Sequence, residues 1–390
     1  MQENQEQLIK TLKLYVPDLW SASAHSASFQ HTRSGYLRNR VSMLCMVWGV
    51  LIVLWAPFDL FFLPEHQGVP AAIARVVLGL FLFTIAKVNN RQTSLHKAQW
   101  CMALMVFGLN VFYLYTMQIL NYPEVSSGFE YGYTLLPILH VAILTILPVT
   151  LKESLGLLAM TAITQIYVGF QTERLFTPEH IADLWLQNVL ALMVIWSQLS
   201  KLYMLMRLYR QATLDPLTGI YNRRMLLQLA QKSLKSCEAK DAPFSILLFD
   251  IDRFKRINDT WGHSAGDKVL RGFADFMQTQ IRKTDLFGRY GGEEFILFLP
   301  RCNGEMAEKI AERMLTSIRQ LELPSGYDDS TLKITTSIGI ATNSGSDTLS
   351  SLIERADRAL YECKDSGRDC CRFHHVGHLY LGDERRRAMA

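Results

Sequence analysis

The chain has 390 residues, of which 49% are hydrophobic, and its formal net charge is +4 at pH 7. A chain of this length favours two domains over one core, and its small, evenly spread positive charge argues against a nucleic-acid-binding surface. Charged residues concentrate from residue 201 onward, so the sequence predicts a lipid-soluble first half and an ordinary globular second half.

Residues 1–40 are polar, carry several charges and contain no short apolar region followed by a small-residue cleavage site. We therefore expect a retained cytoplasmic N-terminal segment rather than a cleaved signal peptide. The seven cysteines form no Cys-x-x-Cys pair and no zinc-like spacing, and an odd number fits a set of disulfides poorly. We expect them to be reduced thiols.

Six apolar runs follow, each close to the roughly 20 residues that cross a bilayer core. They lie at residues 41–62, 69–86, 98–120, 131–149, 155–170 and 184–202. Lysines and arginines gather on one side of the resulting topology, whereas the opposite loops are acidic except for Arg174. Because basic loops favour the cytoplasm, the sequence predicts an α-helical transmembrane domain of about six spans over 41–202, with both termini cytoplasmic.

Polar residues inside these runs leave the role of this half open. Asn110 and His140 could bind a ligand or a metal, although hydrogen bonding between helices is the more common arrangement. No run contains the charged pathway typical of transporters, so a receptor role is the remaining alternative to simple anchoring. Residues 203–214 then continue the last run with helical spacing and predict a stiff linker, which is short for a dimeric coiled coil.

An alternating α/β pattern occupies residues 215–373. The predicted helices are 222–239, 265–282, 304–321 and 349–366, and the predicted strands are 245–250, 332–341 and a hairpin of 286–290 with 295–299. Residues 374–390 form a tail with several His and Arg residues. A metal or anionic-lipid contact is possible there, but a mobile solvated end is more common.

Carboxylates fall where the predicted strands end. Asp250 and Asp252 close one strand, and Glu293 and Glu294 lie in the hairpin turn. If the strands are neighbours, the like charges raise each other's pKa, and this arrangement is costly without a cation. A pair of Mg²⁺ ions would relieve the repulsion, because Mg²⁺ prefers oxygen ligands, and such sites serve phosphoryl and nucleotidyl transfer.

The two glycines before these glutamates fit the same chemistry. Gly291 and Gly292 permit a sharp turn and let a phosphate or ribose approach the backbone. Alternatively, Asp250 caps a loop and the turn is a solvated hairpin tip. The coincidence of the motifs weakens that alternative.

Residues 215–373 resemble the GGDEF family of diguanylate cyclases. The resemblance rests on DPLTGIYNRR at 215–224, FDIDRFKRINDTWGHSAGD at 249–267, GRYGGEEF at 288–295 and ADRALYECKDSGRD at 356–369. It implies a palm-like α/β (α+β) domain with a central, mostly antiparallel sheet. It also implies a homodimer in which two domains, each with one GTP, face each other and form cyclic di-GMP and two pyrophosphates.

The resemblance also implies roles for individual residues. The catalytic and metal-binding set is Asp250, the backbone carbonyl of Ile251, Glu293 and Glu294, with two Mg²⁺ per site, Mn²⁺ as a substitute, and Glu294 as a further ligand or base. The substrate-binding set is Asn258 and Asp267 for guanine, Lys255, Lys364 and Arg368 for the triphosphate, and Gly291 and Gly292. The implied product-inhibition set is Arg282, Asp285 and Arg313.

The resemblance further implies a bacterial inner-membrane protein that acts in biofilm or motility control. The main rival is an inactive family member that binds cyclic di-GMP through Arg282 and Asp285, or GTP through the old active site. Such members commonly lose a metal carboxylate, a glycine or a guanine contact, whereas all of these are present in this sequence. An active cyclase is therefore the preferred interpretation.

Overall fold

The computed structural model describes residues 15–91, 93–123, 127–324, 331–345 and 347–374. The chain divides into two compact units, Met1–Tyr209 and Arg210–Ala390. Most of the predicted tail, residues 375–390, lies outside the described residues, as does the start of the N-terminal segment, residues 1–14.

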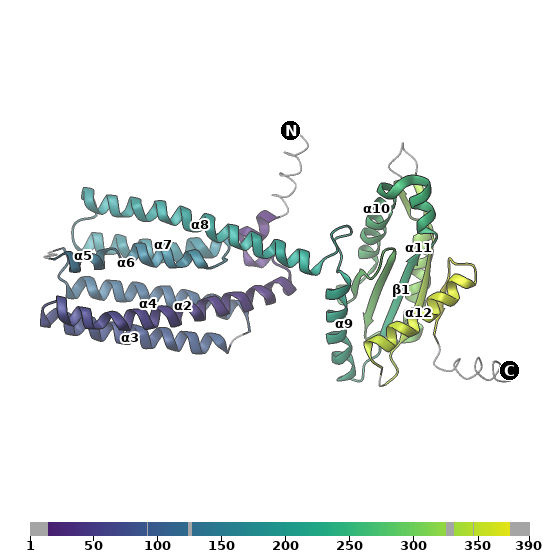
Figure 1. Ribbon diagram of the computed structural model, residues 1–390, viewed down its shortest axis with the longest axis horizontal. Coiled ribbons are helices and arrows are strands. Elements are labelled where there is room, and N and C mark those ends of the chain that lie inside the picture. The colour runs from purple at the N-terminus through teal and green to yellow at the C-terminus, as the bar shows by residue number, and fades with distance from the viewer. Residues whose placement is uncertain (1–14, 92, 124–126, 325–330, 346, 375–390) are drawn as a thin grey trace. The chain divides into compact units, whose positions relative to one another are not determined.

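Helices account for nearly all of the described N-terminal unit, and they lie side by side (Figure 1). They are η1 (Ala22–Ala24), α2 (Ala27–Phe62), α3 (Glu65–Asn90), α4 (Leu95–Ile119), α5 (Gly128–Thr134), α6 (Leu136–Ile143), η2 (Leu144–Ile146), α7 (Leu151–Gln171) and α8 (Pro178–Thr213). By length and composition, five helices within the described ranges are able to cross a membrane, or six if the bent pair 128–134 and 136–146 is one span.

The predicted fourth run, 131–149, contains more than one helix. A bend of 45° separates α5 from α6 and η2. Pro137 lies at the start of α6 and has no backbone N–H to continue the hydrogen bonds of α5, which accounts for the break. The first helix differs too, because α2 begins at Ala27, where the Ser26 side chain accepts a hydrogen bond from the Phe29 N–H.

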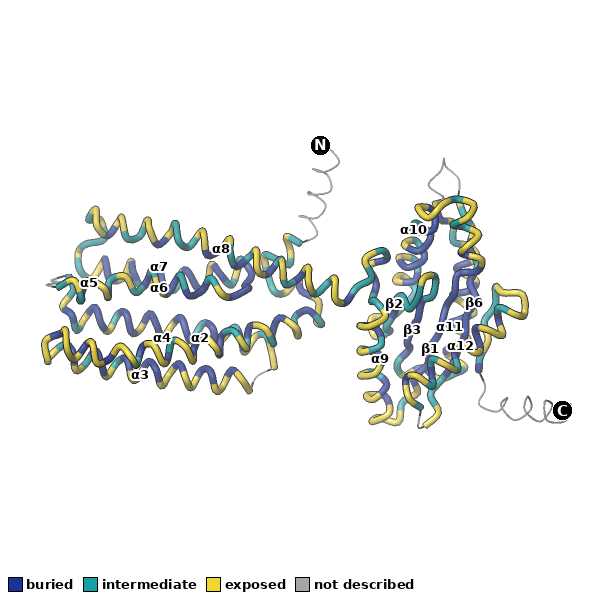
Figure 2. The backbone as a smooth tube through the Cα atoms, viewed as in Figure 1, coloured by how far each residue is buried: buried dark blue, intermediate teal, exposed yellow. Residues whose placement is uncertain are grey.

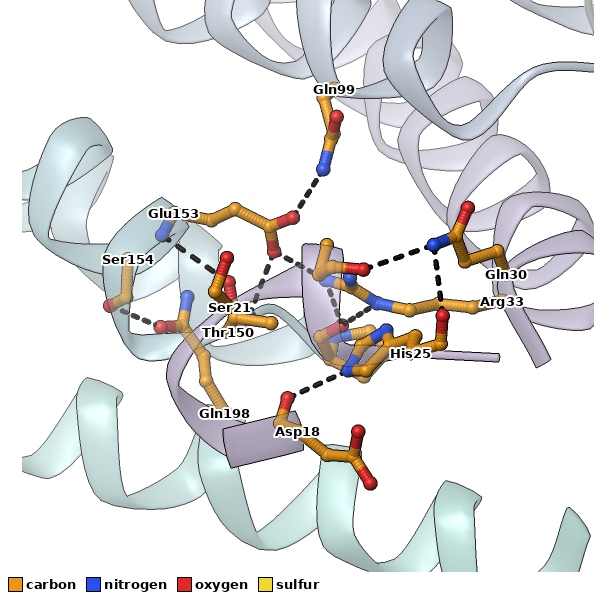
Figure 3. A network of polar contacts seen from close by, with 12 residues as sticks. Asp18, Ser21, His25, Gln30, Arg33, Gln99, Thr150, Glu153, Ser154 and Gln198 are labelled. Atoms are coloured by element: carbon orange, nitrogen blue, oxygen red, sulfur yellow. Dashed lines mark hydrogen bonds and ion pairs between the residues drawn. The ribbon is translucent and has the colours of Figure 1, made fainter. Parts of the chain in front are cut away.

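A buried polar network joins several of these helices (Figure 3). Arg33 of α2 is fully buried, forms an ion pair with Glu153 of α7 and donates to the Pro148 carbonyl oxygen at 3.4 Å. Glu153 also accepts from Gln99 of α4. In α8, Gln198 accepts from Ser154 at 2.6 Å. The network therefore connects α2, α4 and α7, and α8 joins it next to Glu153.

We expect Arg33→Met to destabilise the N-terminal unit by about 3–5 kcal/mol, because Glu153 is then left largely buried without its cation. Thermal unfolding of the detergent-solubilised chain, followed by tryptophan fluorescence, measures the change. Arg40→Met is the matched control on the same helix, since Arg40 contacts the exposed Tyr36. Equal melting temperatures for the two variants would contradict this expectation.

The last part of α8 packs against the N-terminal segment. Leu202 and Met206 are buried against Phe29, with Tyr15 and Leu19 partly buried beside them. Helix α8 continues without interruption to Thr213, so the predicted linker is helical. One side of this helix is thus already covered within the N-terminal unit.

The C-terminal unit is a five-stranded sheet covered by helices on both faces (Figure 1). Its elements are α9 (Arg223–Glu238), β1 (Phe244–Ile251), α10 (Phe254–Gln280), β2 (Leu286–Arg289), β3 (Glu294–Pro300), α11 (Gly304–Arg319), β4 (Glu322–Pro324), β5 (Thr331–Lys333), β6 (Thr336–Thr342), α12 (Leu349–Asp365) and β7 (Cys371–Phe373). The strand order is β2-β3-β1-β6-β7, and only the β6–β7 pair is parallel. The predicted mostly antiparallel sheet is confirmed.

Every residue of the central strand β1 is buried, because apolar side chains cover both of its faces. On one face, Phe249 packs with Phe273 of α10 and with residues of α11. On the other face, Phe244 and Phe298 stack and pack against α9 and α12. This packing explains why the strand appears in the sequence as an unbroken apolar run.

Two expectations for this unit are corrected. Helix α10 begins at Phe254 rather than at residue 265, because Gly262, with φ of 76°, joins a short first helix to the predicted one. Cys363 and Cys370 form a disulfide, with Cα atoms 5.9 Å apart, whereas the other five cysteines are free. The end of α12 and the start of β7 bring these two cysteines together, which their spacing alone did not indicate.

Candidate active site

Three of the four predicted carboxylates meet at one end of the sheet. Asp250 of β1 lies directly opposite Glu294 of β3 in the antiparallel register, and the Ile251 N–H donates to the Glu293 carbonyl oxygen at 3.3 Å. Lys364 of α12 places its Nζ 2.7 Å from Asp250 Oδ2. Residues more than 100 positions apart in the sequence therefore form one charged cluster.

The cluster carries an excess of negative charge in a partly buried place. Burial raises the pKa of Asp250, and its contact with Lys364 offsets this only in part. Burial also raises the pKa of Glu293 and of Glu294, and the neighbouring Asp250 carboxylate raises both further. Three carboxyl groups that resist ionisation together are stabilised by an added cation.

The donor atoms fit a hard divalent cation such as Mg²⁺. Asp250, Glu293 and the carbonyl of Ile251 offer only oxygen, the ligand that Mg²⁺ prefers. In this conformation Asp250 contacts the Lys364 ammonium group. Within the described parts of the chain, we find no group of three His, Cys, Asp or Glu side chains arranged to hold a metal. The fit therefore rests on donor chemistry and charge.

The raised pKa of Glu294 predicts a pH-dependent stability. The folded state binds the Glu294 proton more tightly than the unfolded state does, so stability is lost as pH rises through the raised pKa. Without metal, Glu294→Gln should stabilise the fragment 210–390 at pH 7 by about 0.5 kcal/mol, a small value because solvent screens a half-buried carboxylate. The difference should vanish below the ordinary pKa of 4.5.

Urea unfolding at several pH values measures this difference. Glu238→Gln, at the exposed end of α9, is the control and should change stability less at pH 7. A Glu294→Gln variant that is less stable than the parent at pH 7 would contradict the proposed repulsion.

Asp252 does not join the carboxylate cluster, although it ends the same strand. Its Oδ1 accepts from Ser337 Oγ at 2.7 Å, and its Oδ2 accepts from Thr335 Oγ1 at 2.7 Å and from the Asp369 N–H at 3.0 Å. The bond from Asp369 connects Asp252 to the loop that follows α12. Asp252 therefore positions the neighbouring Arg368, whose side chain is exposed.

The hairpin turn is held from outside by Arg289 and Asp215, which the sequence had not singled out as site residues. Arg289 donates to the Gly292 carbonyl oxygen through Nη2 at 2.6 Å and forms an ion pair with Asp215 at 3.2 Å. Burial acts to raise the pKa of Asp215, but hydrogen bonds from Thr218 and the charge of Arg289 outweigh it and hold this pKa below its ordinary value. The Asp-Pro-Leu-Thr-Gly segment thus fixes the turn.

Gly291 packs against a carboxylate of the cluster. A Cβ atom there would lie 2.3 Å from Glu294 Oε2, so any other residue would displace that carboxylate. At Gly292, by contrast, an added Cβ would meet nothing within 4 Å. Of the two predicted turn glycines, only the first is sterically constrained.

The predicted guanine readers lie on the two halves of the kinked helix α10. Asn258 belongs to the first half and Asp267 to the second, and both are partly exposed. A Cβ atom on Gly266 would lie 1.9 Å from Asn258 Oδ1, so the Asn258 side chain rests directly on Gly266, beside Asp267. Gly266 is a further site residue that the sequence alone did not indicate. Lys255, also on the first half, is exposed.

The predicted product-inhibition residues surround the turn between α10 and β2. Asp285 Oδ2 accepts from the Arg282 N–H at 2.9 Å, and the Asp285 N–H donates to the Arg282 carbonyl oxygen at 3.1 Å. Arg313 of α11 reaches the same segment and donates to the Gln280 carbonyl oxygen at 3.1 Å. The side chains of Arg282 and Arg313 are exposed.

Comparisons with known proteins agree on this unit. Residues 212–370 match the family model described as "Diguanylate cyclase, GGDEF domain". The response regulator PleD of Caulobacter vibrioides is 40% identical over 159 residues, which are 40% of this chain and 35% of PleD. Diguanylate cyclase DgcM of Escherichia coli is 39% identical over 155 residues, which are 40% of this chain and 37% of DgcM.

Among solved structures, the GGDEF domain of DgcB from Caulobacter crescentus, in complex with c-di-GMP, is 31% identical, with a TM-score of 0.41 and coverage of 42% of this chain and 96% of that one. The chain spans little more than a third of the length of PleD and DgcM. The similarity is therefore one of a domain. Residues 212–370 of this chain are a GGDEF domain of the diguanylate cyclase family.

Proposed function

We propose that the chain is a diguanylate cyclase that condenses two GTP into cyclic di-GMP and two pyrophosphates. The observation that carries the proposal is the meeting of Asp250, Glu293 and Glu294 at one end of the β1–β3 pair, with Lys364 in contact. The GGDEF match and the similarity to proteins named diguanylate cyclase support it.

The reaction follows from the groups that the site offers. Asp250, Glu293 and the Ile251 carbonyl would hold Mg²⁺, or Mn²⁺ in its place. When bound, the metal would lower the pKa of the attacking 3′-hydroxyl and offset the charge of the α-phosphate. Glu294 is the candidate proton acceptor, because its raised pKa lies closer to neutrality than that of a solvated glutamate.

The remaining residues bind and orient GTP. The Asp267 carboxylate accepts from guanine N1–H and N2–H, and the Asn258 amide donates to N3 or O6. Lys255, Lys364 and Arg368 offset the charge of the triphosphate. Gly291 leaves room beside the Glu294 carboxylate for the turn to approach the substrate.

The balance of the reaction requires two such domains. Each 3′-oxygen forms a bond to the α-phosphorus of the opposite nucleotide while the bond to pyrophosphate breaks, and ring closure takes two of these steps. One site with one GTP completes only half of them. A homodimer with facing active sites supplies both nucleotides at high effective concentration.

We further propose that the N-terminal unit anchors the enzyme in a bacterial inner membrane, with the GGDEF domain in the cytoplasm, where GTP is available. Exposed residues recur along its helices (Figure 2). Many of them carry large apolar side chains, including Phe61 at 81% and Trp196 at 77%. The basic residues of the loops support the orientation.

Incubation of the purified full chain with GTP and Mg²⁺, followed by chromatography and mass spectrometry, tests the activity. We expect cyclic di-GMP and two pyrophosphates per product, and no product when EDTA removes the metal. A folded, dimeric, Mg²⁺-supplied sample that binds cyclic di-GMP but forms none would contradict the proposal and favour a binding module.

Product inhibition through Arg282, Asp285 and Arg313 is the regulatory part of the proposal. An exposed guanidinium binds guanine O6 and N7 as a fork, a contact worth about 1–3 kcal/mol. Arg282→Ala should therefore raise the cyclic di-GMP concentration for half-inhibition about 5- to 150-fold. Initial rates measured at increasing concentrations of added cyclic di-GMP give this half-inhibition concentration. Lys283→Ala, which changes the exposed neighbouring residue, is the control. Superimposable inhibition curves for the parent and Arg282→Ala would rule the site out.

A further inference from the structure

A cavity of about 550 Å³ lies among helices α2, α3, α4, α5 and α6 of the N-terminal unit. Its walls are mostly aromatic and aliphatic, and they include Trp48, Trp55, Phe112 and Leu139. Trp55 and Leu139 are about half exposed, at 48% and 40%, so the cavity reaches the apolar outer surface. The volume of the cavity is large enough for a small molecule, and its mostly apolar walls favour a ligand with an apolar part.

The polar part of the cavity is a buried ion pair. Arg75, on the cavity wall, is paired with Asp59, and its Nη2 donates to the Tyr133 hydroxyl at 2.8 Å. Asp59 offsets the charge of Arg75, so the cavity has no strong preference for an anion. Arg75 Nη1 forms no hydrogen bond within the described residues, which leaves its N–H groups as donors.

His140 provides a second polar group. It lies on the cavity wall and is only 3% exposed, and its Nδ1 has no hydrogen-bond partner among the described residues. Solvent does not reach this nitrogen, so a molecule in the cavity does not contact it. Arg75 is therefore the polar residue of the wall from which we argue ligand binding.

Flat aromatic groups already surround Arg75. Its guanidinium carbon lies 5.3 Å from the centre of the Phe112 ring and 5.1 Å from that of the Tyr133 ring. Trp55 and Phe129, both on the wall, have nearly parallel rings, with an angle of 6°. Planar walls of this kind favour a planar ligand that stacks.

We propose that this cavity binds a neutral, planar carbonyl compound with an apolar tail, of the quinone class. The ring lies between the aromatic walls, one carbonyl oxygen accepts from Arg75, and the tail leaves by the exposed edge near Trp55 and Leu139. This binding site lies in the N-terminal unit and takes no part in the proposed cyclase reaction.

Binding is tested on the full chain in lipid nanodiscs without GTP, so the outcome does not depend on the cyclase activity. Decylubiquinone is the probe, and quenching of tryptophan fluorescence reports its approach to Trp48 and Trp55. Decylbenzene, which has the same tail but no carbonyl, competes in a second titration. We expect saturable quenching by the quinone and at least about 10-fold weaker competition by decylbenzene.

Two variants address the site itself. Gly132 lies on the cavity wall, and an added Cβ there would meet nothing within 4 Å, so Gly132→Leu fills the cavity without an initial clash. Gly156→Leu on α7 is the matched control, because that position is equally open and lies outside the cavity lining.

We expect Gly132→Leu to raise the dissociation constant for decylubiquinone at least about 10-fold, with Gly156→Leu unchanged. Circular dichroism and gel filtration confirm that each variant is folded. Equal quinone affinity in the parent and in the folded Gly132→Leu variant, or equal affinity for decylbenzene, would overturn the proposal.

Discussion

A Glu293→Gln variant of the full chain is expected to form cyclic di-GMP about 10²- to 10³-fold more slowly than the parent protein. Glu293 lies in the hairpin turn beside Asp250, and its pKa is raised by burial and then by that neighbour. The substitution removes a full negative charge from a site that needs it to hold a divalent cation, while the shape of the side chain stays nearly the same. Losses of this size follow from the removal of one preorganised charge-stabilising group.

Product formation at saturating GTP and a series of Mg²⁺ concentrations, measured by chromatography, tests this effect. Glu308→Gln, on the exposed side of α11, is the matched control and should keep the parent rate. The loss should be smaller when Mg²⁺ is raised, because weaker metal binding is part of it. A rate within a factor of two of the parent would remove Glu293 from the catalytic set.

The second large effect is expected from Gly266→Ala, a change of one methyl group. The new Cβ would lie 1.9 Å from Asn258 Oδ1 and 3.1 Å from Phe254 Cζ, so the Asn258 side chain must swing away. The domain should stay folded, because the displaced atom is the end of a side chain that is partly exposed. The KM for GTP should rise about 10- to 100-fold, the equivalent of one lost hydrogen bond to guanine.

Steady-state kinetics with GTP gives the KM, and thermal unfolding confirms the fold. Asn258→Ala should show the same rise, and the double variant should be no worse than either single one, since both remove one contact. Ser264→Ala, exposed on the same helix, is the control. Additive effects of Gly266→Ala and Asn258→Ala would show that they act through different contacts.

The central strands were predictable because their physical signals are local. Residues 245–250 are apolar without a period, and the structure buries all of β1. The Gly-Gly turn between two apolar runs predicted the β2–β3 hairpin, and the register of β1 with β3 then brings Asp250 opposite Glu294. The residues of the carboxylate cluster could therefore be identified from the sequence, whereas their contacts required the structure.

The remaining features depend on contacts between distant residues. Asp252 appears in the sequence as one more strand-end carboxylate, yet it holds Asp369, which is 117 residues away. Arg289 likewise gains its role from Asp215, 74 residues earlier. The sequence predicted α10 only from residue 265, whereas Gly262 is a kink that joins an earlier helical segment to the predicted one.

The contact between Asn258 and Gly266 also affects how tightly the site binds a nucleobase. Because the side chain already rests on the helix backbone, it has little rotational freedom left to lose when a ligand arrives. Ordering one free side chain on binding costs about 0.5–1.5 kcal/mol. Folding of the kinked helix therefore already restricts the Asn258 side chain. Binding of a nucleobase then loses little further side-chain entropy, because the amide is preorganised.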